Sequence, residues 1–146
     1  MTTQTTYKIH FEKRDDGIVI LTFNRPSAMN ALDLESMHRF LQLINMVADD
    51  NTVRVLILTG AGTRAFCSGG DLNELSAYTS EEDALDFITI MGDALLKMER
   101  LPLPVIAAIN GYALGGGSEI ALACDLRIVD DHTRMGFIQS RMGVTP

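Results

Sequence analysis

The chain has 146 residues, of which 47% are hydrophobic and 21% are charged, and its formal net charge is −7. This composition excludes a disordered segment and predicts a single folded domain, residues 1–146, that buries a core. The acidic charge and the lack of a basic stripe with interleaved aromatic side chains argue against nucleic acid as a partner. No apolar run is long enough to cross a membrane, and the N-terminal stretch lacks the core of a signal peptide, so we expect a cytoplasmic protein without membrane contact.

The N-terminal half predicts a strand hairpin, a helix and a buried strand. Apolar and polar residues alternate over 7–12, a DDG turn follows, and the apolar stretch 18–23 completes the hairpin. Asp33 suits the N-cap of an amphipathic helix, because apolar residues recur at helical spacing over 34–48. The continuous β-branched and leucine-rich run at 53–59 is typical of a strand covered on both faces.

The second half repeats the order of strand, glycine loop and helix. Ser80 is the expected N-cap of a second helix. The core-facing side of this helix is predicted from helical spacing to consist of Ala84, Ile88, Met91, Leu95 and Met98. Two prolines end the helix, a second buried strand follows, and a third helix is expected from about Ser118 to Cys124, before a short strand at 126–130. This order favours an α/β fold with buried strands.

The segment GAGTRA, residues 60–65, matches a dinucleotide-binding fingerprint directly after a strand. That fingerprint requires a helix to open at its second glycine, so that the helix N-terminus meets the pyrophosphate. Here further turn-forming residues, FCSGGD, follow instead. We therefore expect a turn and no nucleotide cofactor.

The cysteines and histidines carry no ligand pattern. Cys67 and Cys124 have no short paired spacing, so we expect both to be buried packing residues. His10, His38 and His132 are far apart with no ligand spacing, so no metal site is expected.

Two glycine-rich segments are the candidate chemical sites. In CSGGDL, residues 67–72, the glycines allow the backbone to approach a ligand and the Gly70 N–H to point at an oxygen, although a plain turn is an alternative. Residues 115–117 are three glycines between a strand and a helix, where unpaired N–H groups and the helix dipole favour negative charge. These are the components of an oxyanion hole, and Glu119 could serve the same pocket as an acid, a base or an anchor for water. The alternative is a tight turn in which Glu119 only complements the helix dipole.

Three motifs carry a family resemblance. NRPSAMNAL, AFCSGGDLNEL and PVIAAINGYALGGGSEIALACDLRI resemble, in order and spacing, the crotonase family, also called the enoyl-CoA hydratase/isomerase superfamily. The resemblance covers nearly the whole chain and implies the α/β fold of the ClpP/crotonase group, a spiral of repeated ββα units. It also implies an enzyme that processes acyl-CoA thioesters and needs no separate cofactor, because coenzyme A is part of the substrate.

The resemblance assigns roles to individual residues. The backbone N–H groups of Gly70 and Gly116 would stabilise the enolate formed at the thioester carbonyl, and Glu119 matches one of the two acids that handle water or protons in hydratases. The expected lining of the CoA and acyl-thioester site consists of Ala28, Ala31, Ser68, Asp71, Leu72, Tyr112, Leu114 and Gly115. Arg25 and Arg64 are weaker candidates for contact with CoA phosphates, and a solvated surface position is the favoured alternative for both.

The residue aligned with the second hydratase glutamate is Gln139. An amide can orient a ligand, but it does not take or give a proton at neutral pH. Decarboxylation of a malonyl-type CoA makes a lighter demand, because loss of carbon dioxide creates the enolate without a base. FIQSRMG and SGGDLNEL also resemble the ethylmalonyl-CoA decarboxylase branch, so a hydratase- or isomerase-like activity and a decarboxylase activity both stay open. An ionised Glu119 would repel a substrate carboxylate, which is an objection to the second.

Family chains continue well beyond residue 146, so their C-terminal helical part is expected to be absent here. If the chain is whole, a hydrophobic face would be exposed and would favour association. A homo-oligomer is expected, a trimer or a hexamer at full length. The rival interpretation is a non-catalytic acyl-CoA-binding or assembly module, or an inactive fragment.

Overall fold

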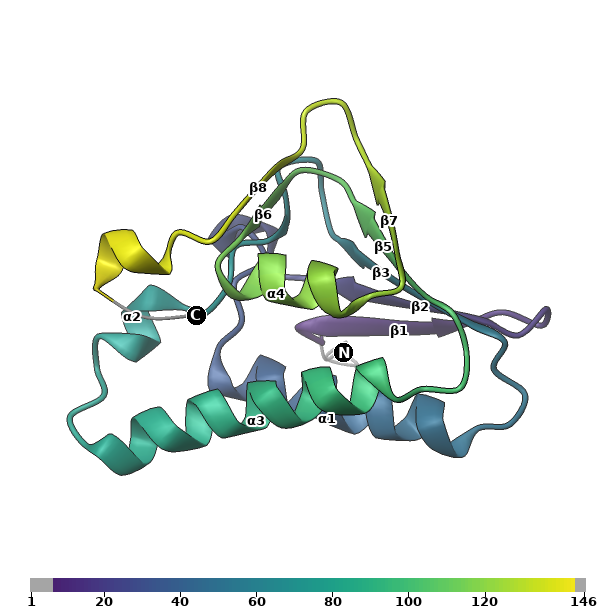
Figure 1. Ribbon diagram of the computed structural model, residues 1–146, viewed down its shortest axis with the longest axis horizontal. Helices are drawn as coiled ribbons and strands as arrows, with labels where there is room; N and C mark the ends of the chain where they lie inside the picture. Colours follow the sequence, from purple (N-terminus) through teal and green to yellow (C-terminus); the bar gives the residue numbers. More distant parts are fainter. Residues whose placement is uncertain (1–6, 144–146) are drawn as a thin grey trace, which may run out of the picture.

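The computed structural model describes residues 7–143, which form two parallel-rich sheets and four α-helices (Figure 1). The larger sheet has the strand order β1-β2-β3-β5-β7. Its strands are β1 (Ile9–Lys13), β2 (Ile18–Phe23), β3 (Val55–Gly60), β5 (Val105–Ile109) and β7 (Leu126–Val129). The antiparallel β1–β2 hairpin predicted from the alternating pattern is confirmed, and the remaining neighbours pair in parallel.

Strand β3 is less enclosed than its sequence predicted. Leu56 and Leu58 are fully buried, but the alternate residues Val55, Ile57 and Thr59 are only half-buried. One face of this strand therefore packs in the core, while the opposite face is partly open. The expectation of cover on both faces is wrong for the described part of the chain.

A second sheet of three short strands was not predicted from the sequence. It consists of β4 (Ala65–Cys67), β6 (Tyr112–Leu114) and β8 (Arg134–Gly136), paired in parallel in the order β4-β6-β8. Each strand has three residues, which is too short for a period of two to be recognised. This sheet holds the two glycine segments together, because β4 leads into the first and β6 into the second.

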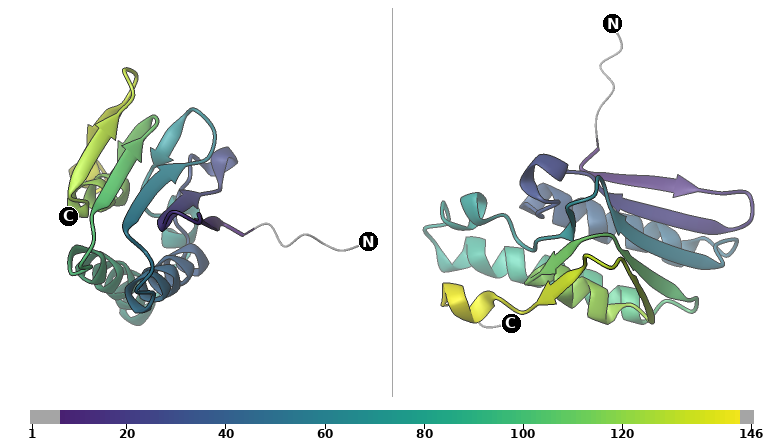
Figure 2. Two further views of the ribbon diagram at one scale, coloured as in Figure 1. Left: turned by 90° about the vertical axis from the view of Figure 1, so that its right-hand side faces the viewer. Right: turned by 90° about the horizontal axis from the view of Figure 1, so that it is seen from above.

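The helical elements confirm most of the predicted boundaries. They are the 3₁₀ turn η1 (Pro26–Ala28), α1 (Leu34–Asp49), α2 (Leu72–Leu75), α3 (Glu81–Glu99), α4 (Gly116–Ala123) and the 3₁₀ turn η2 (Gln139–Met142). Asp33 and Ser80 cap α1 and α3 as expected, by accepting from the N–H groups of Ser36 and Asp83. Helix α4 begins at Gly116, two residues before its predicted start, so the glycines form its first turn. Helices α1 and α3 lie side by side beneath the larger sheet (Figure 2).

The predicted core face of α3 requires a correction. Phe87, Met91, Ala94 and Met98 are its buried residues, whereas Ile88 is 65% exposed. The helix is turned so that the larger aromatic ring enters the core. Phe87 and Ile88 both fit the helical spacing, so periodicity alone did not distinguish them.

The core joins both sheets to the helices. Phe23 of β2 packs against Phe40 of α1 and Phe66 of β4, with ring centroids 5.7 Å and 5.4 Å apart, and all three rings are buried. Aromatic pairs at this separation stabilise a core beyond the area they bury. Among residues 7–143, no helix is both long and apolar enough to cross a membrane.

Candidate active site

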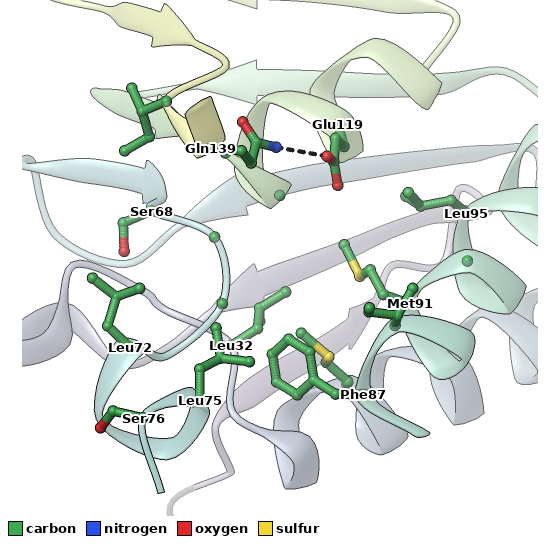
Figure 3. A pocket seen from close by; sticks show the side chains of 18 residues that line it. Leu32, Ser68, Leu72, Leu75, Ser76, Phe87, Met91, Leu95, Glu119 and Gln139 are labelled. Atoms are coloured by element: carbon green, nitrogen blue, oxygen red, sulfur yellow. Dashed lines mark hydrogen bonds between the residues drawn. The ribbon is translucent and has the colours of Figure 1, made fainter. Parts of the chain in front are cut away.

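A cavity of about 750 Å³ opens between α3, α4 and the two glycine segments (Figure 3). We name residues 68–71 the first glycine loop and residues 115–117 the second glycine loop. The apolar wall on one side of the cavity consists of Leu75, Phe87, Met91 and Leu95. The polar groups come from the two glycine loops, Glu119 and Gln139. A largely apolar cavity with a few convergent polar groups is typical of a small-molecule site.

The two glycine loops lie in contact. Gly69 has φ +92°, a left-handed conformation that favours glycine, and a Cβ atom there would lie 3.0 Å from the nitrogen of Gly116. A Cβ atom on Gly116 would in turn lie 3.9 Å from the nitrogen of Gly70. The N–H groups of Gly70 and Gly116 thus come from neighbouring backbone segments at one side of the cavity.

Both of these N–H groups are unpaired. Within residues 7–143, neither the Gly70 nor the Gly116 N–H donates a hydrogen bond to an acceptor of the chain. Gly116 is the first residue of α4, where the N–H groups have no partner inside the helix. Two free backbone donors that line one cavity can bind an oxygen atom carrying negative charge.

Glu119 and Gln139 form a hydrogen-bonded pair beside these donors. The Gln139 Nε2 donates to Glu119 Oε1 at 2.7 Å, as the dashed line in Figure 3 marks. Glu119 Oε2 faces the second glycine loop, since it would lie 3.8 Å from a Cβ atom on Gly116. Gln139 is 8% exposed, and its Oε1 has no partner within the described residues. One carboxylate oxygen is therefore held by an amide, and the other is available for proton transfer.

The structure brings seven of the sequence-predicted site residues to this cavity. They are Ser68, Gly70, Leu72, Gly115, Gly116, Glu119 and Gln139. Glu119 is the fourth residue of α4 and lies one turn inside the helix, so its position follows directly from the early start of that helix.

The other five predicted residues lie outside the cavity lining. Ala28 is in η1, and the carbonyl of the buried Ala31 accepts from Arg25. The Asp71 carboxylate is engaged as the N-cap of α2 and in an ion pair with Arg25. Tyr112 and Leu114 belong to β6, where backbone pairing fixes them. Contact of these five with coenzyme A stays a prediction.

The apolar wall was only partly foreseen. Met91 and Leu95 were expected on the core side of α3, and Met91 does pack in the core, but both also line the cavity. Phe87 and Leu75 were not predicted to line the site. Both lie close to Gly70, because a Cβ atom there would lie 3.0 Å from Phe87 Cζ and 3.1 Å from Leu75 Cδ1. A side chain at residue 70 would therefore crowd Phe87 and Leu75, which would have to shift to admit it.

Two features that the sequence raised lie beside or outside the cavity. In the GAGTRA segment no helix opens at the second glycine, and β4 begins at Ala65, so the dinucleotide-binding geometry does not form. Cys67 lies next to the first glycine loop and is buried. Because desolvation raises its pKa to about 12, Cys67 is a neutral thiol at neutral pH and not a nucleophile. Residues 7–143 contain no group of three or more His, Cys, Asp or Glu side chains able to hold a metal ion.

Comparison with known proteins gives a consistent result. A family model described as enoyl-CoA hydratase/isomerase matches residues 13–146. The chain is 37% identical over 135 residues to the short-chain-enoyl-CoA hydratase of Clostridium acetobutylicum, covering 92% of this chain and 51% of that protein. It is 36% identical over 138 residues to the ethylmalonyl-CoA decarboxylase of Pongo abelii, covering 94% and 46%.

The fold also has a close counterpart among solved structures. The enoyl-CoA hydratase from Bacillus anthracis superposes with a TM-score of 0.91 at 35% identity, covering 96% of this chain and 54% of that one. The chain thus spans about half the length of the relatives it matches. The α/β fold expected from the three motifs is confirmed, and the chain belongs to the enoyl-CoA hydratase/isomerase family, with the crotonase fold.

Proposed function

We propose that this chain binds an acyl-CoA thioester and stabilises the enolate at the thioester oxygen with the N–H groups of Gly70 and Gly116. The observation that carries the proposal is the pair of unpaired donors on the adjoining glycine loops. Such donors lower the barrier because they meet negative charge as it develops in the transition state, and one of them contributes about 3 kcal/mol. The apolar wall of Leu75, Phe87 and Met91 would hold the acyl chain.

In a hydratase-like reaction Glu119 would be the single acid–base group. Its free Oε2 would take a proton from water while the water oxygen bonds to Cβ of the enoyl group, and the electron pair of the double bond would move into the enolate. The same proton would then return from Glu119 to Cα as the enolate collapses. Gln139 would hold Oε1 throughout, since an amide gives no proton to the product.

A malonyl-type decarboxylation is the second candidate, and the amide at position 139 favours it. The bond between Cα and the carboxylate would break, carbon dioxide would leave, and the electron pair would enter the same enolate. Glu119, in its protonated form, would then give the one proton needed at Cα, so a second acid is not required and no charge on Glu119 would repel the substrate carboxylate. The 36% identity to an ethylmalonyl-CoA decarboxylase agrees with this candidate.

A mass-spectrometric assay distinguishes the two reactions. Purified protein is incubated separately with crotonyl-CoA, methylmalonyl-CoA and ethylmalonyl-CoA, and the molecular masses of the products are measured. Addition of one water to crotonyl-CoA would establish the hydratase, and loss of carbon dioxide from either branched substrate would establish the decarboxylase. Glu119→Gln is the matched variant, because it keeps the size of the side chain and replaces the acid–base group with an amide that neither accepts nor gives a proton at neutral pH. We expect turnover to fall by roughly 10²- to 10⁴-fold.

The rival interpretation, a binding or assembly module, predicts binding without turnover. Gly70→Pro removes one of the two donors, whereas Gly70→Ala adds a Cβ atom at the same position and keeps the N–H. An enzyme should therefore be slower by roughly 10²- to 10³-fold in Gly70→Pro than in Gly70→Ala. Circular dichroism of both variants checks that the fold is kept. Acyl-CoA binding with no product from the unsubstituted protein would reject catalysis by this chain. The homo-oligomer and the cytoplasmic location stay predictions.

A further inference from the structure

Arg25 forms an ion pair with Asp71, the last residue of the first glycine loop, and neither side chain lines the cavity. The Arg25 Nη2 donates to Asp71 Oδ2 at 2.8 Å, across 46 residues of sequence. The two side chains are 23% and 12% exposed, so the pair is shielded from water far more than an ordinary surface ion pair. The other arm of the guanidinium, Nη1, donates to the carbonyl of Ala31 at 2.8 Å. Arg25 therefore joins two separate backbone segments, and its Nη1 also lies 3.5 Å from Asp33 Oδ2.

The backbone on both sides of Gly70 is fixed to Leu32. The Leu32 N–H donates to the Gly69 carbonyl at 2.8 Å, and the Asp71 N–H donates to the Leu32 carbonyl at 2.9 Å. The Gly69 carbonyl and the Gly70 N–H belong to one trans peptide unit, so they point in opposite directions. When Leu32 holds the carbonyl, it also aims the Gly70 N–H away from Leu32.

The ion pair holds Leu32 and Asp71 in this arrangement. Arg25 Nη1 donates to the carbonyl of Ala31, the residue before Leu32. Arg25 Nη2 donates to the carboxylate of Asp71, the residue after Gly70. Asp71 Oδ1 also accepts from the Asn73 N–H at 3.0 Å, which anchors the start of α2. The planar guanidinium can satisfy both acceptors at once, whereas a lysine ammonium has no such fork geometry.

We propose that Arg25 and Asp71 are positioning residues that keep the Gly70 N–H aimed at the substrate oxygen. This inference rests on the proposed role of Gly70 as an enolate donor. Neither side chain touches the reacting atoms. Loss of the pair lets the Ala31–Leu32 segment and the first glycine loop move apart, and a misplacement of about 1 Å at a reacting group lowers rates by roughly 10²-fold.

The test compares Arg25→Met, Arg25→Lys and Asp71→Asn with a control pair elsewhere. Lys13 and Asp50 form a more exposed ion pair, 2.6 Å apart, and neither residue lines the cavity, so Lys13→Met is the control. With the substrate that the unsubstituted protein turns over, we expect kcat to fall roughly 10- to 100-fold in the Arg25 and Asp71 variants while KM changes little. Lys13→Met should keep both constants. The double variant Arg25→Met with Asp71→Asn should be no slower than the worse single variant, because the pair acts as a unit.

A second readout needs no turnover. In ¹⁵N-labelled protein, the Gly70 amide resonance should shift when crotonyl-CoA is added. In Arg25→Met this shift should be smaller. The resonance of Gly92, elsewhere on the cavity wall, should behave in Arg25→Met as it does in the unsubstituted protein. If Arg25→Met keeps its kcat and its Gly70 shift, the pair serves only stability and the inference is wrong. If crotonyl-CoA leaves the Gly70 resonance of the unsubstituted protein unmoved and no substrate is turned over, the proposed function itself fails and the inference falls with it. Turnover of substrate by the unsubstituted protein together with full activity of all three variants would overturn the inference alone.

Discussion

At the scale of single residues, Gly117 sets how closely α4 approaches β4. A Cβ atom there would lie 2.7 Å from the carbonyl carbon of Cys67 and nearer still to its oxygen. Real Cβ atoms do not occupy such positions, so the helix rests directly on the strand backbone. This close approach is also what carries Gly116 to the first glycine loop, and residue 117 therefore affects the cavity without lining it.

Gly117→Ala should lower the free energy of unfolding by roughly 1 to 3 kcal/mol, because the new methyl group forces α4 away from β4. Gly92→Ala is the matched control, since a Cβ atom on Gly92 meets nothing within 4 Å in the middle of α3. That control should raise the free energy by about 0.5 to 1 kcal/mol. Urea unfolding of both variants measures the two effects. An unchanged midpoint for Gly117→Ala would show that α4 is not held in contact with β4.

The sequence predicted the glycines, Glu119 and Gln139 because each lies in a local motif. It did not predict the partner of Arg25, which depends on the pairing of Leu32 with the first glycine loop. A bond between residues 46 positions apart has no local signal, so the sequence suggested only a phosphate contact or a solvated surface position for Arg25 and not an internal ion pair. Phe87 was missed for a similar reason, since the rotation of α3 is set by packing.

At the scale of elements, long periodic segments were predictable and short ones were not. Helices α1 and α3 and strands β2 and β3 have enough residues for a period to be recognised. Strands β4, β6 and β8 have three residues each and depend on pairing with one another. The second sheet is thus a tertiary effect, although it decides where both glycine loops lie.

Two carboxylates hold the start of α1: Glu74 Oε2 accepts from the Leu34 N–H at 2.8 Å, and Asp33 is the N-cap. Asp33 Oδ1 accepts from the Ser36 N–H at 2.9 Å, and Asp33 Oδ2 accepts from Lys8 Nζ at 2.6 Å. Burial raises the pKa of Asp33, but the hydrogen bonds from Lys8 and Ser36 outweigh burial and leave this pKa below its ordinary value. Hydrogen bonding to Arg25 lowers the pKa of Asp71 as well. The carboxyl groups of Asp33 and Asp71 are therefore held in their charged form by the fold.

A carboxyl group with a lowered pKa stabilises the folded state above its unfolded pKa, and this stabilisation is lost as pH falls through the folded pKa. The free energy of unfolding should therefore decrease below about pH 4. Asp33→Asn keeps a capping side chain but removes the charge, so this variant should show a smaller decrease than the unsubstituted protein. Asp15→Asn, on the exposed turn between β1 and β2, is the control. Urea titrations between pH 3 and pH 7 measure the profiles, and identical profiles for Asp33→Asn and the unsubstituted protein would contradict the argument.

At the scale of the whole molecule, the cavity exists only because segments distant in sequence share one core. The buried cluster includes residues of β1, α1, β4, α3 and α4. Some of the side chains that pack in this core also form the walls of the cavity. Phe87 and Met91 belong to both. Opening of this core would therefore remove the site together with the fold, and the chain should lose both in one transition.

Cys67 and Cys124 provide a direct test of this coupling. Both are free, buried thiols in that core, and burial raises the pKa of each to about 12. A thiol of this kind reacts only after it reaches water and ionises, so both cysteines should resist a thiol reagent such as iodoacetamide in the native protein. In increasing urea, labelling of both should rise together with the loss of circular dichroism, as expected for one cooperative domain. Each single variant, Cys67→Ser and Cys124→Ser, reports the other thiol alone. Labelling of Cys67 at a lower urea concentration than Cys124 would show that the strand leading to the first glycine loop opens separately, and the prediction of a single cooperative domain would then be wrong.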